Sequence, residues 1–247
     1  MRRASKCTPW CITVLRGSRY LESSFLWTKF QVLHLMKYTT PFHVQNAVGE
    51  LPPGLCQTFM RSMDSINALP GATSRQCLRA LYWLACARRP LTSTELMEAI
   101  AIDDMDEAWD PTRVVSDPTV IINYCANLIS PENGTDNQRV RLFHPSVKDF
   151  LVDHPTLFVP MLPRAVTPDH YGLQFLLARD CLKYLTIVSH KPALFLPHSS
   201  QNFSHYLRNA GAYGQHLADL FIAVVRSAIA QDVFAYYKCS LPCGCVL

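Results

Sequence analysis

The chain has 247 residues, of which 49% are hydrophobic, 11% aromatic and only 17% charged. An average soluble domain has about 25% charged residues and disordered chains are richer still in polar and charged residues, so this composition excludes a disordered protein. The length fits one large or two small domains, which bury enough surface to fold without disulfide bonds or metal ions. The low charge predicts a surface that packs against another molecule.

The net charge of +4 comes from the first 40 residues, which contain seven Lys or Arg side chains and one acidic side chain, Glu22. The rest of the chain has a small acidic excess. Because apolar runs separate the basic residues, this stretch is a poor nucleic-acid patch and we interpret it as a solvated segment.

The cysteines indicate a reducing compartment. The chain has 10 of them, mostly scattered, and Cys77, Cys125 and Cys181 fall in apolar helical patterns where free cysteine packs as a small hydrophobe. Residues 1–17 lack the long apolar run and the small-residue cleavage site of a signal peptide. No uncharged apolar run approaches the roughly 20 residues that span a bilayer. We therefore expect a cytoplasmic protein that does not contact a membrane.

The first 70 residues predict a poorly ordered start followed by helices. Residues 1–20 have no sustained periodicity, whereas residues 21–70 form a helical lead-in. Within it, helical spacing occurs over residues 25–36, Thr39-Thr40-Pro41 breaks the pattern, and a cleaner helix follows over residues 55–66.

Residues 72–155 predict a winged helix domain, so the expected fold class is mainly α. A first helix carries an apolar face over residues 78–85, and Thr92-Ser93-Thr94-Glu95 is a capping box that opens a second. Asp117-Pro118 supplies an N-cap and a first-turn proline for a third helix over residues 119–129.

A β-hairpin is expected to follow these three helices. Its first strand is short, with only Leu128 and Ile129, and its second alternates polar and apolar residues over 139–143. A turn is expected at residues 131–134, and His144-Pro145 starts a last short helix. Three helices followed by a hairpin is the order of a winged helix.

The C-terminal third predicts a helical segment over residues 165–238, after a proline-rich connector. Its first helix, over residues 173–188, has a continuous apolar stripe that predicts an amphipathic helix. A loop at residues 192–200 and further helical patterns at 203–209 and 217–225 follow, and the tail 239–247 is irregular.

Motifs for catalysis and metal binding are missing from the sequence. There is no G-x-x-x-x-G-K-[ST] loop, no G-x-S-x-G elbow, no H-E-x-x-H and no paired C-x-x-C. The acidic loop at residues 103–110 lacks the glycine and the ligand phase of a calcium site and is interpreted as solvated. The cysteines at 239, 243 and 245 do not have the usual zinc spacing. We therefore assign no catalytic residue, metal site or cofactor and expect no enzyme.

Two observations bear on ligand and nucleic-acid binding. His144 lies at a strand-to-helix junction, where it could act as a capping or packed side chain or as a functional one. The third helix, which would read DNA in a winged helix, has neither Lys nor Arg, and the hairpin adds only Arg139 and Arg141. Nucleic-acid binding is therefore disfavoured.

Five short motifs in a fixed order resemble a known family. They are Ser24-Phe25-Leu26-Trp27, Leu51-Pro52-x-Gly54-Leu55, Arg89-Pro90-Leu91-Thr92-x-x-Glu95-Leu96-x-x-Ala99-Ile100, Arg141-Leu142-Phe143-His144-x-Ser146-Val147-Lys148-x-Phe150-Leu151, and Cys181-Leu182-x-Tyr184-Leu185. Over roughly residues 21–220 the chain resembles the segment downstream of the NACHT domain in fungal NOD-like (STAND) proteins, many of which end in ankyrin repeats. Its core is similar to the winged helix domain named after GPI inositol-deacylase.

The resemblance implies a regulatory or interaction module that works beside a NACHT ATPase and a repeat array. It also implies that His144 contacts bound nucleotide when a NACHT module is present. Because no P-loop and no repeat occur in this sequence, we expect a truncated, non-catalytic fragment whose partners are other proteins or the missing NACHT and ankyrin modules. The alternatives are a winged-helix nucleic-acid binder and a truncated gene product without independent function.

Overall fold

The computed structural model describes residues 19–52, 54–103, 106–132, 139–188 and 194–226, and the chain divides into two compact units, Met1–Ser65 and Ile66–Leu247. The expectations for residues 1–18, for the turn at Asn133-Gly134 and for the tail 239–247 lie outside the described residues. The part that is described is mainly helical with one two-stranded hairpin, which confirms the predicted fold class.

The first unit contains α2 (Arg19–Leu35), α3 (Pro41–Gly49) and most of α4 (Leu55–Asn67). The ring of Phe30 packs edge-on against Phe59 at 5.4 Å between centroids, and the Gln31 side-chain amide donates to the Thr58 hydroxyl at 3.0 Å. Thr40, where the sequence predicted a break between helices, is the N-cap of α3: its hydroxyl accepts a hydrogen bond from the His43 amide.

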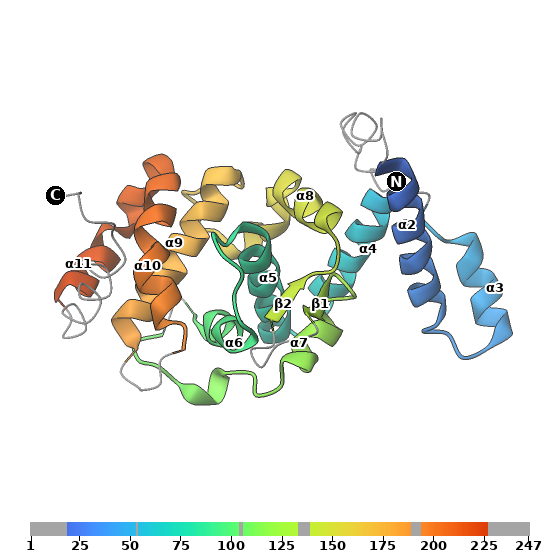
Figure 1. Ribbon diagram of the computed structural model, residues 1–247, viewed down its shortest axis with the longest axis horizontal. Coiled ribbons are helices and arrows are strands. Elements are labelled where there is room, and N and C mark those ends of the chain that lie inside the picture. Colours follow the sequence, from blue (N-terminus) through green and yellow to red (C-terminus); the bar gives the residue numbers. More distant parts are fainter. Residues whose placement is uncertain (1–18, 53, 104–105, 133–138, 189–193, 227–247) are drawn as a thin grey trace. The chain divides into compact units, whose positions relative to one another are not determined.

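The winged helix elements surround α5 (Gly71–Cys86), which contacts the other three helices and the hairpin (Figure 1). These elements are α6 (Ser93–Ala101), α7 (Pro118–Tyr124), β1 (Ile129–Glu132), β2 (Arg139–Leu142) and α8 (Pro145–Asp153). The predicted capping box of α6 is confirmed: the Glu95 amide donates to the Thr92 hydroxyl at 3.2 Å, and the Thr92 amide donates to the Glu95 carboxylate at 2.9 Å.

Helix α7 is shorter than the predicted 119–129, and the first strand is longer than predicted. After the C-cap Cys125, Ala126 and Asn127 take positive φ values of 50° and 65°, so the chain leaves the helix there. Strand β1 includes Pro131 and Glu132, which the sequence placed in a turn, and Glu132 pairs with Arg139. In a two-stranded sheet both strands are edges, so β1 can accommodate a proline.

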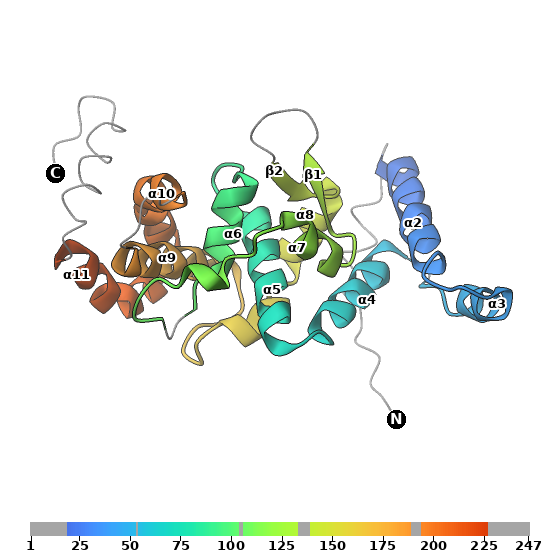
Figure 2. The ribbon, with the colours of Figure 1, turned by 90° about the horizontal axis from the view of Figure 1, so that it is seen from below.

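In the C-terminal part of the second unit, the residues that the structure describes form five further helices. They are η2 (Pro155–Met161), α9 (His170–Ile187), α10 (Leu196–Asn209), η3 (Gly211–Leu217) and α11 (Ala218–Arg226). Figures 1 and 2 show α9, α10 and α11 side by side, with α10 and α11 both packed on α9.

Two predictions for this part are wrong. Helix α10 starts at Leu196, inside the expected loop 192–200, because Pro197 fits the first turn of a helix where no amide donor is needed. Helix α9 is not amphipathic in the fold: from Gly172 to Leu182 every side chain is buried, including Gln174, Arg179 and Asp180. It is a central helix with neighbours on all sides.

Candidate functional site

The sequence-predicted residue His144 is the N-cap of α8. Its Nδ1 accepts a hydrogen bond from the Ser146 amide at 3.2 Å and lies 2.6 Å from the Ser146 hydroxyl. Pro145 occupies the first helical position, where its fixed φ suits a helix start. The capping interaction occupies Nδ1, so only Nε2 is left for a ligand, and the nucleotide contact stays a prediction.

A buried charge cluster joins α5 to α9. The Asp180 carboxylate has no solvent exposure; it accepts hydrogen bonds from the Tyr82 hydroxyl and from Arg179, whose Nε and Nη2 lie 3.2 and 3.1 Å away. The Arg79 guanidinium lies 3.7 Å from the same carboxylate, and Arg179 also donates to the Met161 carbonyl at 3.0 Å. Burial and the Asp180 charge raise the pKa of Tyr82, so the phenol remains protonated and donates.

A second buried carboxylate joins α6 to α9 and α10. Glu98 accepts hydrogen bonds from the Tyr184 hydroxyl at 2.5 Å and from the Phe195 amide at 2.9 Å. Burial and this contact with Glu98 raise the pKa of Tyr184, which keeps the hydroxyl in its donor form. Glu98 therefore accepts one hydrogen bond from a side chain of α9 and one from the backbone at the start of α10.

An aromatic cluster around Trp83 completes the junction between α5 and α10. The Trp83 ring lies 5.2 Å from Phe195, 5.4 Å from His198 and 6.0 Å from Tyr206, all edge-on. The Tyr206 hydroxyl accepts from the Arg88 amide at 2.9 Å and lies 3.0 Å from His198 Nε2. Burial lowers the pKa of His198 to about 3, so the imidazole is neutral at physiological pH.

Sequence reasoning missed these three clusters. The one available signal was the pair Arg179-Asp180 inside an apolar helix, because charged residues are rarely buried unless they are paired. Their partners lie 86 to 98 residues away in the case of Glu98–Tyr184 and Tyr82–Asp180, beyond the reach of any local pattern.

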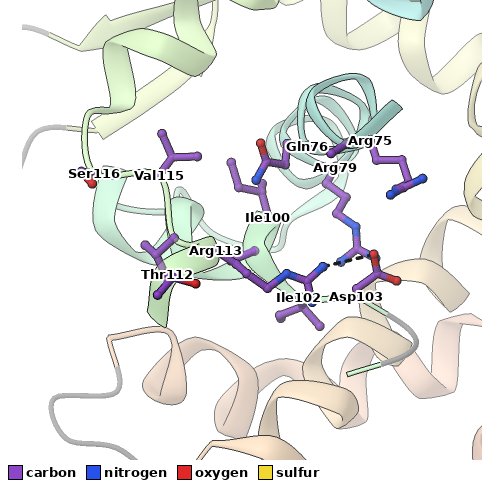
Figure 3. A pocket seen from close by; sticks show the side chains of 13 residues that line it. Arg75, Gln76, Arg79, Ile100, Ile102, Asp103, Thr112, Arg113, Val115 and Ser116 are labelled. Carbon is purple, nitrogen blue, oxygen red and sulfur yellow. Dashed lines mark hydrogen bonds and ion pairs between the residues drawn. The ribbon is translucent and has the colours of Figure 1, made fainter. Parts of the chain in front are cut away.

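A pocket of about 450 Å³ lies between α5, the end of α6 and the loop at residues 111–116, which begins with the short 3-10 helix η1 (Pro111–Arg113) (Figure 3). Arg75, Arg79 and Arg113 line it, and His144 does not. Arg113 donates to Asp106 and, at 3.3 Å, to Asp103. Arg113 therefore joins two acidic side chains in the described part of the acidic loop, a contact that the sequence did not predict.

The helix that reads DNA in other winged helices carries no basic side chain here. Helix α7 has no Lys or Arg over its whole described length, and it exposes Val120 and Tyr124. Arg139 and Arg141 on β2 are both exposed.

The expectation that Cys77, Cys125 and Cys181 pack as free, buried side chains is confirmed, whereas the reducing compartment stays a prediction. Among the residues that the structure describes, no group of three His, Cys, Asp or Glu side chains is arranged to hold a metal ion. Across the same residues, no helix combines the length and apolar character needed to cross a membrane.

Comparison with known proteins identifies one region. A family model described as the winged helix domain of GPI inositol-deacylase matches residues 65–157. Searches of curated proteins and of solved structures found no match. The matched range starts near the end of α4, contains α5 to α8 with the hairpin, and ends in η2. Residues 65–157 are thus a winged helix domain of the GPI inositol-deacylase type.

Proposed function

We propose that the chain is a non-catalytic regulatory or interaction module of a NACHT-type STAND signalling protein. The observation that carries the proposal is the junction between the winged helix and the C-terminal helices. Asp180, Glu98 and the Trp83 cluster are all buried in it, and each links α5 or α6 to α9 or α10. A junction of this kind makes the two parts move together, as a relay between an ATPase and a sensing array requires.

The surface chemistry supports a protein partner. Helix α7 exposes Val120 and Tyr124 and contains no basic residue, whereas DNA-reading helices carry Arg, Lys, Asn or Gln toward bases and phosphates. The five motifs in the order of the NACHT-associated segment support the same assignment.

The test is the mass of the endogenous product together with the 5′ end of its transcript. We expect a larger species that contains an upstream P-loop. A native species of 27.9 kDa, the mass of this chain, would contradict the NACHT assignment.

In that larger species, His144→Asn tests the nucleotide contact, because asparagine is a strong N-cap and leaves α8 capped while the imidazole is lost. We expect retained ADP to fall about ten-fold, the loss of one good hydrogen bond to phosphate. His216→Asn, an exposed histidine in η3, is the matched control. Equal ADP retention in His144→Asn and wild type would remove His144 from the site.

The alternative, a nucleic-acid binder, is tested by gel retardation of duplex DNA at several salt concentrations. Under our proposal the Arg139→Ala/Arg141→Ala double variant behaves as wild type, because any low-salt binding comes from the basic residues before position 40. Loss of binding in the double variant would favour the alternative.

A further inference from the structure

The pocket between α5, α6 and the loop at 111–116 has arginines on facing walls. Arg75 and Arg79 belong to α5, and Arg113 extends from the opposite loop toward Asp103 (Figure 3). We propose that this pocket binds a small phosphorylated ligand, a phosphate monoester on an apolar or aromatic carrier.

The pocket offers an anion one open positive charge, that of Arg75, because Arg79 and Arg113 already face carboxylates. Its lining contains three arginines and one acidic residue, Asp103. Asp106 and Asp180 contact Arg113 and Arg79 but do not line the pocket. Within the described residues Arg75 makes no ion pair, and its side chain is exposed. Its positive charge is therefore open to an incoming anion.

The arrangement of the arginines suits a phosphate group. Arg75 and Arg79 are four residues apart on α5, so they share one face of the helix with their Cβ atoms about 6 Å apart. A guanidinium is planar and can donate two parallel hydrogen bonds to phosphate oxygens. Ser116 borders the same space and its hydroxyl offers a neutral donor, whereas the Thr112 hydroxyl already donates to Asp110 at 2.7 Å.

A ligand can displace the Asp103 carboxylate from Arg113. Its contact with Arg113 is 3.3 Å long and both side chains are about one-third exposed, at 30% and 37%. The Asp106 contact keeps Arg113 in position when Asp103 is displaced, since Asp106 also accepts from the Asp103 amide at 2.7 Å and fixes the loop.

The remaining walls define the carrier. Val114 and Val115 give the pocket an apolar wall, whereas Ile100 and Ile102 are almost completely buried beneath it. The volume of about 450 Å³ lies within the roughly 300–1,000 Å³ range of small-molecule sites. A ligand with a phosphate group and an apolar group would match the positive charge and the apolar wall of the pocket. The site is separate from His144 and does not depend on the proposed function.

The experiment is calorimetric titration of the full chain with phenyl phosphate in a phosphate-free, low-salt buffer. We expect saturable binding that is at least ten-fold weaker in Arg75→Ala and intermediate in Arg75→Lys, which keeps the charge but loses the fork of donors. Arg164→Ala, at an exposed arginine outside the pocket, should bind as wild type.

Titrations with inorganic phosphate and with phenol test the charged part and the apolar part of the ligand separately. We expect phosphate to bind more weakly than phenyl phosphate, and phenol not to bind. Phosphate binding as tight as phenyl phosphate would overturn the apolar carrier. No binding of phenyl phosphate at millimolar concentration, or equal binding by wild type and Arg75→Ala, would overturn the site. Because Arg75 is exposed, its substitution should leave the circular dichroism spectrum unchanged, which checks that the fold is retained.

Discussion

His198 shows how the surroundings of one residue set its chemistry. The ring stacks on Phe195 at 5.4 Å, packs edge-on against Trp83 and shares a hydrogen bond with Tyr206. Burial is the largest cause of its low pKa, and the nearby Arg89 charge lowers it further. The folded protein therefore holds His198 neutral, whereas an unfolded chain protonates it near pH 6.5.

We expect this difference to make the protein less stable as the pH falls from 6.5. Between pH 6.5 and about 3 the unfolded state binds the additional proton, so the free energy of unfolding decreases by up to about 1.4 kcal/mol per pH unit. In His198→Gln the free energy of unfolding should decrease less steeply between pH 6.5 and 5, by about that amount per pH unit. Urea unfolding at pH 7, 6 and 5 measures it.

His216→Gln is the control for that series, because His216 is exposed and should leave the slope unchanged. If the free energy of unfolding depends on pH in the same way in His198→Gln and in wild type, His198 does not take up a proton when the chain unfolds.

At the scale of the element, helix starts follow from local sequence. Thr92, Asp117 and His144 each cap the helix that the sequence placed after them, because a cap and its amide partner lie two or three residues apart. Helix ends and strands were less predictable. The end of α7 depends on the positive φ values of Ala126 and Asn127, which commit the chain to pairing with β2.

We expect Thr92→Ala to lower the free energy of unfolding by about 1 kcal/mol, because the Glu95 amide loses its acceptor at the start of α6. Thr92→Ser keeps the hydroxyl and should stay within about 0.5 kcal/mol of wild type. Denaturant unfolding compares the two. Equal losses in both variants would mean that the threonine methyl group, not the cap, is what matters.

At the scale of the whole second unit, buried polar contacts bind the winged helix to the C-terminal helices. Asp180 lies among Tyr82, Arg79 and Arg179 with no exposure, so its removal takes a buried negative charge away from two buried cations. Such a loss is costly even where the intact ion pair contributes little.

We expect Asp180→Ala to lower the free energy of unfolding by about 3–5 kcal/mol, while α5 and α9 still unfold in one step. Urea unfolding gives the first quantity, and hydrogen exchange followed helix by helix gives the second. Asp149→Ala, at an exposed position of α8, is the matched control and should change stability by less than about 0.5 kcal/mol. Exchange of α9 amides while α5 stays protected would contradict a single cooperative unit.

The sequence by itself determined the helical class, the winged helix order and the caps, since these depend on residues a few positions apart. It also indicated that Cys77, Cys125 and Cys181 would be buried, because they lie on apolar faces. Only the tertiary structure decided that α9 is buried on all sides, that Asp180 and Glu98 join distant helices, and that arginines of α5 and of the loop at 111–116 share a pocket. Periodicity reports which face of a helix is apolar, but it does not report which distant segment covers the polar face.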